Sequence, residues 1–320
     1  MKSPIAGSRS HIFADRHMPG VEVLIRRARW LALLGAAWLC AGGAQAEPSG
    51  DAQTKDTSAS PAKTSRPENG YWSVGKPRWF LSTKSDVGLY LKPYFSAGYG
   101  MPHWIWAGVD VNAISTSEVG QVYAGVRAAS PVFDLAFGFR KTYSYGKPFL
   151  EPRASFSSDQ VGDAGGPNAR YWAWEAEAVG FIPLPSSAIM LDFIAVGVLD
   201  APSDRYLYEE SYRLVIGDSS YIIGRAATVA RLLREDALKV GLLYEWLVGT
   251  GRDQNVFRMG PAAALQLTDH LEAVGTVSVV LHSPDSLGIF LGSYGLAGLR
   301  YRWATGERAP ELPWRGTMIP

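Results

Sequence analysis

Cysteine is almost absent from this chain of 320 residues, because Cys40 is its only thiol. Cys40 lies in an apolar segment near the N-terminus that we expect to be removed during export, and Leu39 before it is too large for a typical lipoprotein box. The mature protein would then contain no cysteine. Disulfide bridges, thiolate metal sites and a cysteine nucleophile are therefore not expected.

Long apolar runs and an excess of one charge are also missing. Past residue 46 no uninterrupted apolar run approaches the roughly 18–20 residues that a membrane helix needs, and the longest, 189–199, contains Asp192. The formal net charge is +1, which gives no electrostatic reason to expect nucleic acid as a partner. No His/Asp/Glu cluster has metal-ligand spacing and no glycine-rich loop opens a helix, so no cofactor is expected.

The N-terminal segment has the three parts of an export signal. Arg26, Arg27 and Arg29 form a basic stretch, residues 30–43 are apolar, and Ala44-Gln45-Ala46 is a small-residue cleavage site. We predict a signal peptide over residues 1–46, although the same segment is also compatible with a retained membrane anchor. Residues 47–70, rich in Ser, Thr, Pro, Lys and Asp, then predict a disordered periplasmic leader.

The rest of the chain alternates between apolar and polar residues. In one stretch Phe133, Leu135, Phe137 and Phe139 share one face of a predicted strand, because successive side chains point to opposite sides. Similar segments recur between turn clusters at 89–98, 105–113, 119–128, 131–143, 172–181, 189–199, 206–216, 221–232, 238–248, 256–267, 271–281 and 289–303. This predicts about 12 strands in one domain over residues 71–304, followed by a tail over 305–320.

Some segments of this domain are ambiguous. Additional candidate strands at 78–83 and 149–157 would raise the number to about 14. Residues 229–240 also have helical spacing, so a short helix there is an alternative. Residues 159–168, with several Gly and Asp, predict a loop.

Aromatic residues gather near the predicted strand ends, at Tyr99, Trp104, Trp172, Trp174, Tyr244, Trp246, Tyr301 and Trp303. With the export signal and the serial alternation, this pattern resembles the outer-membrane β-barrel proteins of bacteria over about residues 76–304. The resemblance implies an all-β, antiparallel transmembrane barrel in the outer membrane, contact with its lipid, and insertion by the barrel-insertion machinery. Members of that family usually end on an aromatic residue of the last strand, whereas here a tail follows Trp303.

Strand parity also predicts which charged side chains face the barrel lumen. These are Lys92, Asp110, Arg127, Asp134, Arg140, Glu175, Glu177, Lys239, Glu245, Glu272, Arg300 and Arg302. Such charges can line a pore for small solutes, or they can pair with one another and fill the lumen. The sequence therefore predicts a passive channel or a structural envelope component.

Two other functions are compatible with parts of the sequence. His282, Ser283 and Asp285 supply the residue types of an outer-membrane lipid acyl hydrolase. Parity turns His282 inward, away from lipid, so a turn-capping role is the simpler interpretation. A soluble periplasmic binding protein is the other alternative, in which the aromatic faces would form a protein core.

Overall fold

A computed structural model describes residues 77–305, except 103, 185–186, 218–219, 233–236, 250–251 and 253. The predicted signal peptide, the leader and all but the first residue of the tail lie outside the described residues. Within the described part of the chain, no helix is long and apolar enough to cross a membrane.

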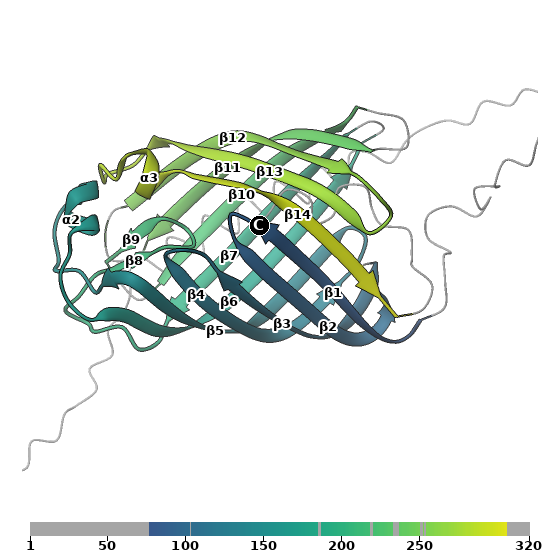
Figure 1. Cartoon of the computed structure of the whole chain (residues 1–320), viewed down its shortest axis with the longest axis horizontal. Helices are drawn as coiled ribbons and strands as arrows, with labels where there is room; N and C mark the ends of the chain where they lie inside the picture. The colour runs from purple at the N-terminus through teal and green to yellow at the C-terminus, as the bar shows by residue number, and fades with distance from the viewer. Residues whose placement is uncertain are drawn as a thin grey trace, which may run out of the picture. The chain divides into compact units, whose positions relative to one another are not determined.

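Twelve strands pair in a closed antiparallel barrel (Figure 1). The ladder closes where the first strand pairs with the last, from Ser82 opposite Ala304 to Gly88 opposite Gly298. Closure leaves no sheet edge whose unpaired backbone groups would face lipid. The wall strands are β1 (Arg78–Gly88), β2 (Leu91–Met101), β3 (Ile105–Ser115), β4 (Val119–Ala129), β5 (Phe133–Pro148), β6 (Asn168–Pro183), β7 (Ser187–Val198), β10 (Ser220–Arg231), β11 (Leu238–Gly249), β12 (Gln254–Gln266), β13 (Leu271–His282) and β14 (Tyr294–Ala304).

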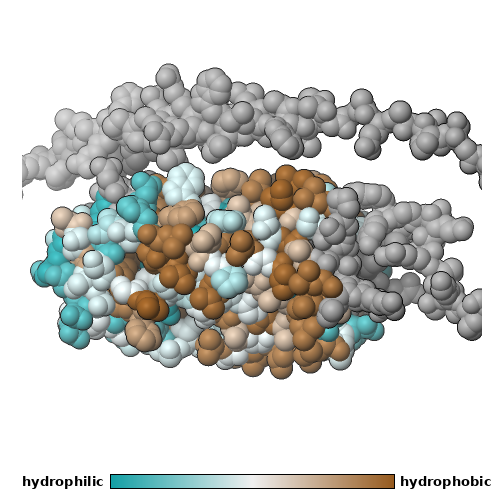
Figure 2. Space-filling view, turned by 90° about the horizontal axis from the view of Figure 1, so that it is seen from above, coloured by the Kyte–Doolittle hydropathy of each residue, from teal (hydrophilic) through white to brown (hydrophobic). Residues whose placement is uncertain are grey.

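The alternation of the sequence becomes an apolar outside and a polar inside. In β5 the four aromatic and leucine side chains from Phe133 to Phe139 are exposed, whereas Asp134 and Arg140 are buried. Figure 2 shows hydrophobic residues over much of the wall, while hydrophilic residues gather at the end that carries α2 and α3 in Figure 1. An apolar band of this kind is typical of a barrel surrounded by lipid.

The predicted number of wall strands is confirmed, but two segments exchange roles. Residues 78–83 begin β1, whereas 206–216 contribute β8 (Leu207–Glu209) and β9 (Leu214–Ile216), which pair as a separate two-stranded sheet. The prediction of 206–216 as a wall strand is therefore wrong, because alternation shows that a segment is extended without showing what its faces touch. Residues 149–157 form no strand either.

Short helices occur only where the connections are long, within the described residues. The segment 159–168, predicted as a loop, contains most of α2 (Ser158–Gly162). Its start is fixed by a capping box, in which the Ser157 hydroxyl accepts from the Gln160 N–H and the Gln160 side chain accepts from the Ser157 N–H. The second helix is α3 (Gly288–Gly292). Around 229–240, β10 continues to Arg231 and β11 begins at Leu238, and residues 233–236 lie outside the described part.

The two ends of the barrel differ. At one end, called here the long-loop end, are the connections 149–167, 199–219 and 283–293. The opposite, short-turn end carries brief connections together with the start of β1 and the end of β14. Backbone bridges tie the long connections to each other, from Leu150 to Tyr206 and from Ser157 to Ser286.

Candidate functional site

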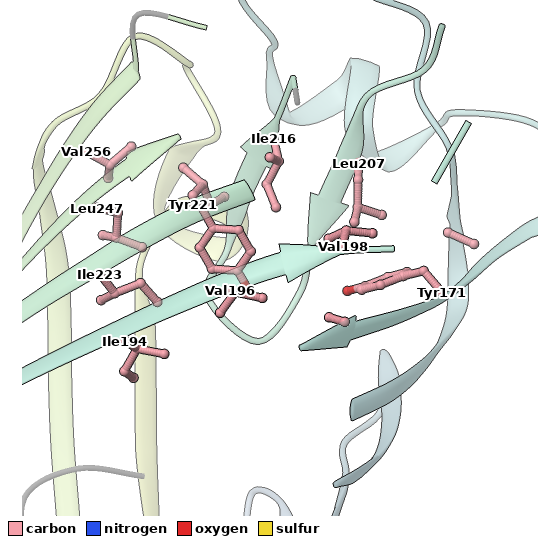
Figure 3. Close-up of a cluster of buried hydrophobic side chains, with 13 residues drawn as sticks. Tyr171, Ile194, Val196, Val198, Leu207, Ile216, Tyr221, Ile223, Leu247 and Val256 are labelled. Carbon is pink, nitrogen blue, oxygen red and sulfur yellow. The ribbon is translucent and has the colours of Figure 1, made fainter. Parts of the chain in front are cut away.

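The hairpin formed by β8 and β9 lies inside the long-loop end of the barrel, and both of its faces are buried. Leu207, Leu214 and Ile216 pack against inward side chains of the wall, among them Tyr171 and Ile223 (Figure 3). The opposite face presents Tyr208 and Val215 to Phe156, Val161 and Leu287 of the other long connections. The hairpin is thus held between the inner wall and a cap of loops.

One buried carboxylate fastens the hairpin to the wall. Glu209, which is 0% exposed, accepts hydrogen bonds from Arg140 (2.9 Å), Tyr171 (2.6 Å) and Tyr221 (3.2 Å). In the turn between β8 and β9, the carbonyl oxygens of Tyr212 and Arg213 accept hydrogen bonds from Arg258, each at 2.8 Å. Hydrogen bonds with one charged partner are stronger than neutral ones, so these contacts fix the hairpin's position.

The turn between β8 and β9 carries a second acidic residue, Glu210, which is buried and borders the interior cavity. Burial raises the pKa of Glu210 to about 7, and the nearby carboxylates of Glu209 and Glu118 add to the increase, while the Ser144 hydroxyl opposes it. This carboxyl group therefore changes its charge near neutral pH.

The charged residues predicted from parity are all buried or half-buried in the barrel. Eight are buried and four, namely Lys92, Arg127, Glu175 and Glu177, are half-buried; the buried ones are Asp110, Asp134, Arg140, Lys239, Glu245, Glu272, Arg300 and Arg302. Their role as the lining of a pore remains a proposal.

Most of these charges are joined in ion pairs between strands that are adjacent or two apart in the barrel. Arg127 contacts Asp110 at 2.8 Å and both Asp134 and Glu177 at 3.1 Å. Glu272 lies between Lys239 (3.1 Å) and Arg302 (3.3 Å). Pairing offsets the high cost of moving an isolated charge out of water.

Several interior charges were not among the residues predicted from the sequence. Asp86 of β1 binds Arg300 at 2.7 Å, and Arg225 contacts both Glu245 (2.8 Å) and Asp192 (3.5 Å). The wall members of this group, Lys84, Asp86, Asp192, Arg225 and Arg258, could have been found by extending the same parity through each strand. Glu209 and Glu210 carry no such signal, because their positions depend on how the hairpin folds inward.

A cavity of about 510 Å³ remains beside the hairpin. Its walls include the hairpin turn with Glu210 and Tyr212, and the inner faces of β1 to β4. At the long-loop end it reaches Glu118, whereas Phe181 and Met190 border it toward the short-turn end. These last two residues belong to a buried apolar cluster.

The residues of the hydrolase alternative lie at the end of β13 and in the connection that follows it. Asp285 accepts hydrogen bonds from Arg252 (2.8 Å) and from the Phe156 N–H (2.9 Å), and its own N–H donates to the Ser283 hydroxyl (3.1 Å). His282 is exposed and stands opposite Phe257, beyond a register shift between Phe257 and Arg258. The inward orientation predicted for His282 is wrong, because an extra residue in β13 reverses the parity.

The predicted interface aromatics are mostly on the outer face. Tyr99, Trp172, Trp246, Tyr301 and Trp303 are exposed, and Trp174 and Tyr244 are half-buried on outward positions. Trp104 is different, because it is only 2% exposed and packs with Met101. Its prediction as an exposed membrane-interface residue is wrong, because nearness to a turn does not show whether a side chain faces outward or is buried.

Within the described residues, no group of three or more His, Cys, Asp or Glu is arranged to hold a metal ion. No protein-family model matches the chain, and no curated protein matches it. Among solved structures, the chain is similar to a KdgM porin in complex with disordered oligogalacturonate, with 7% identity, 69% of this chain and 98% of that chain covered, and a TM-score of 0.36. A NanC porin is 9% identical, with 71% of this chain and 98% of that chain covered and a TM-score of 0.34. The β domain of the Bordetella autotransporter BrkA is 14% identical, with 70% of this chain and 98% of that chain covered and a TM-score of 0.37.

Proposed function

We propose that this protein is a passive, narrow channel for small solutes in the bacterial outer membrane. The observation that carries the proposal is the cavity of about 510 Å³ between the hairpin and the charged inner wall of a closed barrel. The exposed apolar side chains of the outer face would contact outer-membrane lipid. Insertion by the barrel-insertion machinery is part of the same proposal.

The ends of the barrel suggest its orientation. Bacterial barrels have short periplasmic turns and longer extracellular loops. By this rule the long-loop end, with α2, α3 and the hairpin, would face the outside, and residues 78 and 304 would lie on the periplasmic side. Solutes from outside would then meet Glu118 and the hairpin turn first.

A structural envelope component is the second candidate, and it is favoured by the filled part of the interior. The hairpin occupies the long-loop end, and the apolar cluster around Phe181, Met190 and Leu243 occupies space toward the short-turn end. The contacts of Asp285 do not favour the lipid hydrolase alternative, since both of its carboxylate oxygens are within hydrogen-bonding distance of Arg252. The exposed apolar wall weighs against a soluble binding protein.

Current recordings in planar bilayers test the channel. Refolded protein is first checked on a gel, where a closed barrel changes mobility after boiling in detergent. We expect small, discrete steps of current in salt solution, because the hairpin leaves only a narrow path. A correctly folded protein that gives no current in salts of small ions would overturn the channel and favour the structural role.

A further inference from the structure

One line of inward side chains crosses six neighbouring strands without a carboxylate. The strand register places Lys84 opposite both Arg302 and Tyr94, and continues from Tyr94 through Asn112 and Tyr123 to Arg140. All six side chains border the cavity. Neighbours in such a line have Cβ atoms about 5 Å apart, so the line forms a continuous row of groups that can donate hydrogen bonds.

Two lysines of the cavity wall stand apart from the ion pairs of the described barrel interior. Seven cationic side chains and five carboxylates line the cavity among the described residues. Five of the cations, Arg127, Arg140, Arg213, Arg225 and Arg302, form ion pairs with carboxylates. In the part of the chain that the structure describes, Lys84 and Lys92 form none; the Lys84 ammonium stands 5.1 Å from the centre of the Tyr94 ring.

The acidic residue nearest in register to these lysines is already bound. Lys92 stands opposite Asp86, two positions along β1 from Lys84, so both ammonium groups extend from the same patch of inner wall. Asp86 is held by Arg300 through both carboxylate oxygens, at 2.7 and 2.8 Å. Arg300 thus occupies both carboxylate oxygens of Asp86, and among the described residues neither Lys84 nor Lys92 lies within ion-pairing distance of a carboxylate.

We infer that Lys84 and Lys92 form a binding site for small organic anions inside the barrel, with the carboxylate or phosphate group of the solute between the two ammonium groups. Tyr94 and Asn112, next in the row, would contact the polar remainder of the solute. This inference concerns binding, and its consequence for transport, a preference for anions over cations, rests on the proposed channel.

Binding is measured by titrating the folded barrel in detergent with citrate, using calorimetry. The variant is the double substitution Lys84→Gln and Lys92→Gln, and the matched control is Lys141→Gln, because Lys141 lies on the outer side of β5 beside Trp172 and Asp200. We expect citrate to bind the natural sequence and the control, and the double variant to bind about tenfold more weakly, equivalent to ~1.4 kcal/mol. The neutral polyol sorbitol should bind none of them measurably.

Transport is measured separately, from the reversal potential in a gradient of potassium chloride. The natural sequence should favour chloride, and the double variant should lose most of that preference, whereas Lys141→Gln should keep it. If the protein binds citrate but gives no current, the proposed channel is wrong and the proposed anion site is still supported. Lack of citrate binding by the natural sequence, or equal binding by a double variant that passes the gel test for folding, would overturn the site itself.

Discussion

The wall of the barrel and the hairpin inside it are built from the same alternation but respond to different surroundings. In β5 one face is exposed and apolar while the other is polar and buried. In β8 and β9 all six residues are buried, because the wall covers one face and the loop cap covers the other. Alternation thus identifies extended backbone, and the partner of each face is decided by contacts between segments far apart in the chain.

The two regions also differ in what holds them. Each wall strand is paired along its length with two neighbours in a closed ladder. Among the described strands β8 and β9 pair only with each other, and the position of the hairpin depends on apolar packing, on the contacts of Glu209 and Arg258, and on the bridge from Tyr206 to Leu150. The hairpin is therefore held by side-chain contacts and not by the ladder of the wall, so we expect it to be displaced more easily than a wall strand.

Removing the hairpin should have the largest effect and would test this separation directly. Replacing residues 200–219 with a short Gly-Ser linker leaves all twelve wall strands intact. The lumen of a 12-stranded barrel is wider than that of an 8-stranded barrel, which side chains just fill, so we expect single-channel conductance to rise severalfold, to the order of tenfold.

The gel shift on boiling serves as the control for that deletion. If the deletion variant folds but conducts no more than the natural sequence, the hairpin does not limit the path. If the variant fails to fold, the wall needs the hairpin for its stability, and the two are not held independently.

A pair of arginine substitutions, one in each region, should give opposite results. Phe137→Arg places a charge on the exposed apolar face of β5 and should lower the free energy of unfolding by about 2–4 kcal/mol, while the conductance of the folded fraction stays the same. Val215→Arg places a charge in the buried contact between the hairpin and the loop cap. It should displace the hairpin and raise conductance, with a smaller loss of barrel stability.

Urea titrations in lipid vesicles and single-channel recordings measure the two effects side by side. The same response from both variants would show that wall and hairpin form one cooperative unit.

The sequence predicted the wall well because each wall strand is a local pattern. The parity of residues such as Asp110, Glu245 and Arg300 follows from their neighbours in sequence, and each of them is buried in the structure. Prediction failed where a position depends on distant contacts. His282 turns outward because of a register shift, Trp104 is buried against Met101, and Glu209 meets Arg140 only because the hairpin of β8 and β9 folds into the lumen.

A pH dependence should be the smallest effect, and it should involve the hairpin without the wall. Burial raises the pKa of Glu210 to about 7 in the docked hairpin. A displaced hairpin would expose Glu210 to water and return its pKa to the usual, lower value. Between the usual pKa of a glutamate and about 7, Glu210 is protonated when the hairpin is docked and ionised when it is displaced. Docking is therefore strongest at low pH, and it weakens as pH rises through about 7.

Opening events in single-channel records should therefore become more frequent between pH 5 and pH 8, by at least a factor of the order of ten, since the pKa shift of Glu210 exceeds one unit and each unit corresponds to about 1.4 kcal/mol. Glu210→Gln should abolish this dependence and keep the channel in its low-conductance state at both pH values. Glu151→Gln is the matched control, because the Glu151 side chain is 74% exposed in the same group of loops and pairs with Arg205 at the surface. If Glu210→Gln and the control both keep the pH profile of the natural sequence, the titrating group is not Glu210. The position of the hairpin would then not be controlled by protonation of Glu210.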